Sequence, residues 1–104
     1  MVVTGSISNV RYPSKAVAGA NVKVEFHVTI NNTEWGAPSD NYQFLVDADT
    51  EEALKGNYIA GFGDYERDED ITITMPDKDV FRFYLELWTE VPDKYKGVPI
   101  EGIT

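Results

Sequence analysis

Residues 69–90 contain two stretches in which apolar and polar side chains alternate, on either side of Pro76-Asp77. Alternation with a period of two is the pattern of a strand that has one buried and one solvated face. The pattern therefore predicts two antiparallel strands joined by a tight turn. The side chains expected to face the core are Ile71, Ile73, Met75, Phe81, Phe83, Leu85 and Leu87; those expected on the other side are Thr72, Thr74, Arg82, Tyr84, Glu86 and Trp88.

A long strand is also predicted from Asn21 to Asn31, where apolar and polar residues alternate without a break. Only Thr50 to Leu54 has the composition of a single helical turn. Shorter strands are expected at residues 7–12, 42–48, 57–62 and 98–103. About seven short strands separated by turn signals are typical of an immunoglobulin-like two-sheet antiparallel sandwich. A small open β-barrel is the alternative fold.

The length of 104 residues, with 42% hydrophobic side chains, indicates one domain, residues 1–104, with a single core. No segment approaches the roughly 18 apolar residues that span a bilayer. The first ten residues lack the basic and apolar segments of a signal peptide. We therefore expect a soluble all-β domain. The absence of cysteine excludes disulfides and thiolate metal sites.

The net charge of −9 is concentrated in the middle of the chain. Between Asp47 and Asp79 there are eleven acidic residues and three basic ones. Binding to nucleic acid or to an anionic membrane requires clustered Lys and Arg side chains. The charge distribution therefore argues against both kinds of partner, and no membrane insertion is expected.

His27 is the only histidine and the chain has no cysteine, so a Cys-His pair or a metal site with several histidines is excluded by count. It lies on the solvated face of its predicted strand, opposite to the apolar residues. We therefore expect an ordinary surface position with a cross-strand contact. Two carboxylates acting as acid and base would need a cleft, and a sandwich of this length has little chain left to build one. We expect no enzyme.

Two groups of carboxylates are candidate calcium ligands: Asp47 and Asp49 after one predicted strand, and Asp68 and Asp70 before another. The first group lacks the glycine and the glutamate that define the helix-loop-helix calcium loop. In a sandwich the two groups could lie at one end and share an ion. The alternative, which we favour, is a solvated acidic rim that keeps the protein soluble. No cofactor is therefore expected, with calcium as the alternative.

The aromatic residues are the strongest candidates for a binding surface. Arg82, Tyr84 and Trp88 alternate away from the core, so that the two rings should stand about 13 Å apart on an outer sheet face. Rings beside charges suit a protein partner or neighbouring domain, and rings on a flat sheet also suit a carbohydrate. Alternatively, residues 92–99 fold back and cover this face. Trp35, beside Gly36 in a predicted loop, is a second candidate.

Two segments resemble known β-modules. ISNVRYPSKAVAGANVKVEFHVTINNT, residues 7–33, resembles the opening of the immunoglobulin-like modules typified by the cell-adhesion-related domain of bacteria and archaea. TMPDKDVFRFYLELW, residues 74–88, resembles the threonine-rich strand, Met-Pro turn and following strand of microbial surface and virion-associated β-modules. The resemblance implies an extracellular or particle-surface module that binds or spaces, and it brings no catalytic residue.

Together these observations predict a non-enzymatic binding or structural module that contacts a protein partner through an outer sheet face. A carbohydrate-binding module with structural calcium is the alternative. A third possibility is assembly with copies of the same chain through the first or the last strand, since both could be edges of a sheet.

Overall fold

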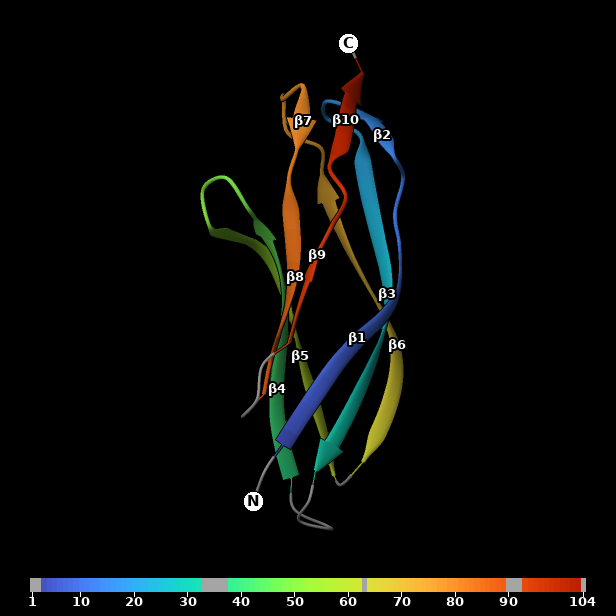
Figure 1. Ribbon diagram of the computed structural model, residues 1–104, viewed down its shortest axis with the longest axis vertical. Helices are drawn as coiled ribbons and strands as arrows, with labels where there is room; N and C mark the ends of the chain where they lie inside the picture. Colours follow the sequence, from blue (N-terminus) through green and yellow to red (C-terminus); the bar gives the residue numbers. More distant parts are fainter. Residues whose placement is uncertain (1–2, 33–37, 63, 90–92, 104) are drawn as a thin grey trace.

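The computed structural model describes residues 3–32, 38–62, 64–89 and 93–103 (Figure 1). These residues form ten strands and no helix, so none of them belongs to a helix that could cross a membrane. The strands are β1 (Val3–Arg11), β2 (Lys15–Val17), β3 (Asn21–Asn32), β4 (Pro38–Asp47), β5 (Glu52–Phe62), β6 (Tyr65–Thr74), β7 (Val80–Phe81), β8 (Phe83–Trp88), β9 (Asp93–Lys96) and β10 (Ile100–Ile103).

Two sheets pack face to face, one with the strand order β1-β3-β6 and the other with the order β5-β4-β8-β9. A short sheet, β2-β10-β7, extends the second layer at one end (Figure 1). Only Arg82 separates β7 from β8, and three residues separate β1 from β2 and β9 from β10, so the ten segments belong to seven runs of chain. The predicted all-β sandwich of about seven strands is therefore confirmed, and in the described ranges the ladders do not close into a barrel.

The first run of chain passes from one layer to the other. β1 pairs antiparallel with β3, whereas β2 pairs in parallel with β10, with Lys15 opposite Glu101 and Val17 opposite Ile103. Pro13 lies between β1 and β2. Because proline has no backbone N–H, it cannot continue the first ladder, and the chain changes sheets at this point.

The core lies between the two layers and is built by alternation along each strand. In β3 every second residue is buried, as the sequence predicts: Val22, Val24, Phe26, Val28 and Ile30. The seven side chains expected to face inward between residues 71 and 87 are buried as well. Removing these side chains from water supplies the main favourable term for folding, about 25 cal/mol for each Å² of apolar surface.

The predicted pairing of the two stretches in residues 69–90 is wrong. β6 pairs with β3, β7 pairs with β10, and β8 lies between β4 and β9. Tight two-residue hairpin turns need a positive φ, and none of residues 76–79 has one. The segment instead carries the chain from one layer to the other, and both strands bury their apolar faces in the same core from opposite sides.

The single helical turn predicted at Thr50 to Leu54 is also wrong. Residues 48–51 form the turn between β4 and β5, and β5 begins at Glu52. Glu51 has a φ of 60°, a left-handed conformation that does not continue into a helix. A strand that the sequence analysis did not predict, β9, precedes β10.

Hydrogen bonds that involve polar side chains join the two layers along both of their edges. On one side the backbone N–H of Ile7 in β1 donates to Asp93 Oδ2 of β9 at 2.9 Å. On the other side Lys55 and Asn57 of β5 donate to backbone carbonyls of β6 at 3.2 and 3.1 Å. The last strand, β10, lies between β2 and β7 and is not an edge, contrary to the expectation that it could serve as one.

Candidate binding surface

Trp88, the last residue of β8, stands on the outer face of the four-stranded sheet with 52% of its surface exposed. Tyr84 is on the same face and half-buried, and Arg82, between β7 and β8, is exposed. The prediction that these residues point away from the core is confirmed. Trp35 lies outside the described residues.

Three further rings share this outer face with Trp88. We call the set Tyr42, Phe44, Tyr58 and Trp88 the aromatic face. Tyr42 in β4 is the register partner of both Trp88 in β8 and Tyr58 in β5, so three rings form a row across three strands. The ring centroids of Tyr42 and Tyr58 are 5.3 Å apart, and those of Phe44 and Trp88 are 5.1 Å apart. The sequence analysis missed Tyr42, Phe44 and Tyr58; the only signal for them is an aromatic residue at alternate positions of predicted strands.

Gly56 makes room for one of these rings. A Cβ atom at this position would lie 2.4 Å from the Phe44 ring, closer than any side chain can approach. Gly56 and Phe44 are register partners, so the ring lies over the glycine backbone of the neighbouring strand. The absence of a side chain at Gly56 thus lets the aromatic face extend from β4 onto β5.

Charged residues border the aromatic face on the side of β9. Lys94 and Lys96 are the register partners of Glu86 and Tyr84, so all four side chains are on the outer face. The Lys94 ammonium lies 4.9 Å from the centroid of the Tyr84 ring, a cation–π distance. The face therefore combines apolar rings with a polar, mainly basic border.

The alternative in which residues 92–99 fold over this face is wrong for the part that the structure describes. β9 lies beside β8 as an edge strand of the same sheet, not on top of it. Tyr95, the ring in this segment, is half-buried and packs against the core. The outer surface of β8 therefore remains open to solvent, as the exposure of Trp88 indicates.

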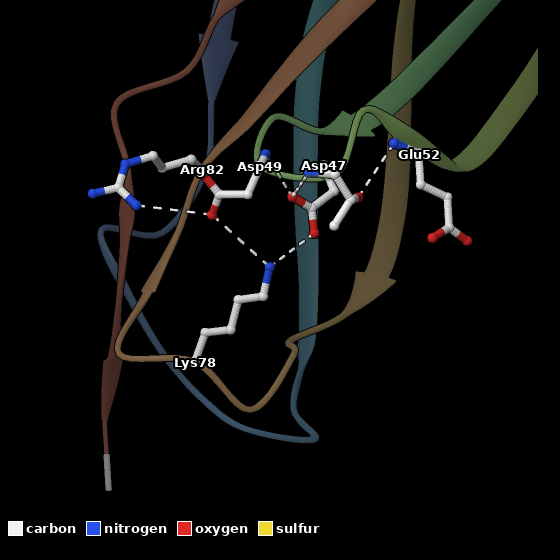
Figure 2. A network of polar contacts seen from close by, with 6 residues as sticks. Asp47, Asp49, Glu52, Lys78 and Arg82 are labelled. Atoms are coloured by element: carbon white, nitrogen blue, oxygen red, sulfur yellow. Dashed lines mark hydrogen bonds and ion pairs between the residues drawn. The ribbon is translucent and has the colours of Figure 1, made fainter.

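Asp47 and Asp49, two of the candidate calcium ligands, lie at the turn between β4 and β5 (Figure 2). The buried Asp47 carboxylate accepts hydrogen bonds from the Asp49 N–H at 2.9 Å and from the Thr50 N–H at 3.4 Å. Lys78 Nζ donates to Asp47 Oδ2 at 3.0 Å and lies 3.9 Å from Asp49 Oδ2. Arg82 is 3.8 Å from the same Asp49 oxygen. The charge that neutralises this pair is thus supplied by the protein's own cations.

The electrostatics of Asp47 follow from these contacts. Burial of the carboxyl acts to raise its pKa, but the hydrogen bonds from Lys78 and from the two backbone amides outweigh burial and hold the pKa below its ordinary value. Asp47 is therefore ionised at neutral pH and fastens the turn to the segment between β6 and β7.

The other candidate calcium ligands lie on the opposite layer. Asp68 Oδ1 is 2.9 Å from His27 Nδ1, its register partner across the β3–β6 ladder, which confirms the cross-strand contact expected for His27. Asp70 lies two residues after Asp68 in β6 and is the register partner of Glu25. The four carboxylates do not form one site, and the described residues contain no group of three or more His, Asp or Glu side chains that could hold a metal ion.

The hydrogen bond to Asp68 raises the pKa of His27 above its ordinary value. Partial desolvation acts in the opposite direction, and Glu66, 3.6 Å from Nε2, adds to the rise. The histidine and its two carboxylates form an exposed charge cluster, and we assign it no catalytic role.

Comparison with known proteins gives distant structural neighbours. No protein-family model matches the chain, and no curated protein matches it. A Bordetella pertussis protein described as ApaA matches 93% of this chain and 89% of its own, with 14% identity and a TM-score of 0.41. A second crystal structure, of a structural-genomics target with no stated function, matches 99% of this chain and 87% of its own, with 12% identity and a TM-score of 0.44. The functional argument therefore depends on the residues of this chain.

Proposed function

We propose that this protein is a non-enzymatic binding module that contacts a protein partner through the aromatic face. The observation that carries the proposal is the row of exposed rings, with Trp88 52%, Tyr42 43% and Tyr58 55% exposed. A contiguous apolar surface of this kind is typical of an interaction site. Tyrosine and tryptophan are also the residues that contribute most of the binding energy in protein interfaces.

The ring geometry favours a protein over a carbohydrate. The planes of Tyr42 and Tyr58 are inclined by 54°, and those of Phe44 and Trp88 by 63°. Only Tyr42 and Phe44, at 13°, are nearly parallel among the ring pairs described on this face, so the four rings do not form one plane. A sugar ring stacks best on a flat platform, whereas inclined rings present ridges and hollows that a protein surface can fill. The charged border of Arg82, Glu86, Lys94 and Lys96 corresponds to the polar rim that surrounds the apolar centre of an interface.

Three further points belong to the same proposal. The strand order β1-β3-β6 against β5-β4-β8-β9, with the first run shared between layers, supports an immunoglobulin-like sandwich. The single histidine and the absence of cysteine support a role without catalysis. The resemblance of residues 7–33 and 74–88 to microbial surface modules supports a place outside the cell or on a particle.

Photo-crosslinking tests the proposal. Benzoylphenylalanine in place of Tyr58, in cells that make the protein, should link a specific partner that mass spectrometry identifies. The purified partner is then titrated with the unmodified protein and with Trp88→Ala. We expect the substitution to weaken binding by about tenfold or more, because a central aromatic residue contributes about 2 kcal/mol to such an interface.

Val98→Ala is the matched control, because Val98 is 70% exposed but lies between β9 and β10, away from the aromatic face. It should change the affinity less than about twofold. Equal affinities for the unmodified protein and Trp88→Ala, with the fold intact by circular dichroism, would overturn the proposal. Retention on insoluble polysaccharides that Trp88→Ala abolishes would instead assign the face to carbohydrate.

A further inference from the structure

Two lysines of β9 differ from the other Lys and Arg side chains of this acidic chain. Six of those lie 3.0 to 3.9 Å from a carboxylate of the same molecule: Arg11, Lys15, Lys23, Arg67, Lys78 and Arg82. Lys55 donates to the Thr72 carbonyl. Lys94 and Lys96 are exposed, and neither forms an ion pair with a carboxylate of the described residues. With 18 acidic residues against 9 basic ones, two neighbouring cations that find no acid are unexpected.

Both lysines stand on the outer face of the sheet, beside β8. Lys96 is the register partner of Tyr84. Lys94 is the register partner of Glu86, and its ammonium lies 4.9 Å from the centroid of the Tyr84 ring. Trp88 follows Glu86 at the next outward position of β8. Lys96, Lys94 and Trp88 therefore follow one another along the sheet in equal steps of about 7 Å.

An extended segment of a partner has the same spacing, because its alternate side chains on one face are also about 7 Å apart. A segment lying along β8 and β9 can thus set three successive side chains on Lys96, Lys94 and Trp88. Carboxylates are complementary to the first two positions. An apolar or basic side chain there would remove water from an ammonium group without supplying an opposite charge. The third position, over the indole, suits an apolar side chain.

We propose that the partner contacts the aromatic face with an acidic segment, whose carboxylates pair with Lys94 and Lys96 while an apolar side chain covers Trp88. The spacing defines the segment as two acidic residues two positions apart and an apolar residue two positions beyond them. This inference rests on the proposed function and names the chemistry of the partner. Lysines on an edge strand also hinder pairing with a further strand, but that role gives no preference for an acidic partner.

Selection from a phage-displayed library of short random peptides tests the chemistry. The unmodified protein is the bait, and Trp88→Ala is used to remove peptides that bind elsewhere. We expect the remaining peptides to carry two Asp or Glu residues two positions apart, with an aromatic or aliphatic residue two positions beyond. Neutral or basic peptides would overturn the acidic segment and leave the proposed function standing. If no peptide prefers the unmodified protein to Trp88→Ala, both proposals fail.

A selected acidic peptide is then titrated with charge variants of the protein. Lys94→Gln combined with Lys96→Gln should weaken binding about tenfold at low salt, and less at high salt, because exposed ion pairs are screened. Lys94→Arg combined with Lys96→Arg should retain the affinity. The matched control is Lys15→Gln combined with Lys23→Gln, which changes the net charge equally on β2 and β3. It should change the affinity less than about twofold, since neither strand belongs to the aromatic face.

Glu86→Gln should change the affinity in the opposite direction. It removes the carboxylate that lies opposite Lys94, so an acidic peptide should bind about twofold more tightly. A misfolded variant would not produce this gain. Equal affinities for the unmodified protein and the Lys94→Gln, Lys96→Gln variant, with the fold intact by circular dichroism, would overturn the proposal. So would an equal loss in the Lys15→Gln, Lys23→Gln control, because the effect would then belong to net charge.

Discussion

The two outer faces of the sandwich are opposite in character, although the two layers share one core. On the face of β1-β3-β6, charged side chains pair across the strands, His27 with Asp68 and Glu25 with Arg11 at 3.7 Å. Glu25 also pairs along β3 with Lys23 at 3.3 Å. On the face of β5-β4-β8, rings stand in contact with one another. Charged side chains lose little in water, whereas exposed rings keep a large apolar area unburied. The proposed function accounts for the difference: a partner would cover the aromatic face, and the charged face would remain in solvent.

If the difference is confined to the outer faces, the inner faces should contribute equally to stability. Ile71 of β6 and Leu85 of β8 are both buried. We expect Ile71→Ala and Leu85→Ala each to lower the free energy of unfolding by about 2–5 kcal/mol, through lost burial and a residual cavity. Urea unfolding measures both values. Val98→Ala, at an exposed position, should change the free energy by no more than about 0.5 kcal/mol.

The second prediction tests which face of β4 is buried. Gln43 is buried, and neither its amide nitrogen nor its carbonyl oxygen has a hydrogen-bond partner in the described part of the chain. Gln43→Met keeps the shape of the side chain and removes two unsatisfied polar atoms. We expect the free energy of unfolding to rise by about 1–3 kcal/mol.

Tyr42→Thr, on the other side of the same strand, serves as the comparison for Gln43→Met. Tyr42 is 43% exposed, so its loss should change stability much less than a core substitution does. A large loss with Tyr42→Thr and no gain with Gln43→Met would mean that β4 presents its rings to the core, and the contrast between the two outer faces would then fail.

The ion pair between Lys78 and Asp47, at the turn between β4 and β5, should contribute less to the free energy of unfolding than the buried side chains do. Lys78→Ala removes the cation from the buried Asp47 carboxylate, and we expect a loss of about 1 kcal/mol, since Lys78 is about one-third exposed and partly screened. In the unmodified protein the lowered pKa of Asp47 contributes stability above the ordinary Asp value of about 3.9. That contribution is lost as the pH falls through the lowered pKa, and the acid-side loss should be smaller in Lys78→Ala. Lys23→Ala, which removes an exposed ion pair, is the control.

The smallest expected effect on stability is that of His27, on the outer face of β1-β3-β6. Because Asp68 raises the pKa of His27, the protonated histidine stabilises the fold. This contribution is complete below the ordinary histidine value of about 6.5 and is lost as the pH rises through the higher pKa of the folded state. A proton NMR titration reads the value directly, because the chain has one histidine. Asp68→Asn should lower the pKa of His27; an unchanged pKa would show that the pair does not form in solution.

The sequence was sufficient to predict which residues are buried wherever strongly apolar and charged side chains alternate, as in β3 and from Ile71 to Leu87. It was not sufficient to predict partners, because alternation defines the faces of a strand and not its neighbours. β6 and β8 therefore looked like a hairpin, although they belong to different layers. β9 was missed because its four residues, Asp-Lys-Tyr-Lys, contain a single ring, and its inward position becomes evident only beside β8.

The candidate surface was predicted in part. Trp88 and Tyr84 follow an unambiguous apolar alternation in β8, so their outward direction could be inferred. In β4 the same reasoning does not tell which side chains are buried, because aromatic residues alternate with Gln43 and Leu45. Either set could face inward. The structure buries Leu45 together with Gln43 and leaves Tyr42 exposed, a choice set by the neighbours of β4 on both sides.

The passage of the first run from one layer to the other at Pro13 also determines how the molecule would respond to a pulling force. β1 begins near one end of the long axis and β10 ends at the other (Figure 1). Because β2 and β10 run in parallel, tension applied at the two ends would draw them along each other in opposite directions. Their hydrogen bonds, together with that from the Glu101 N–H to the Ser14 carbonyl at 2.9 Å, would be loaded in shear and would have to break together. The short β2–β10 ladder is thus placed where it would act as a mechanical clamp.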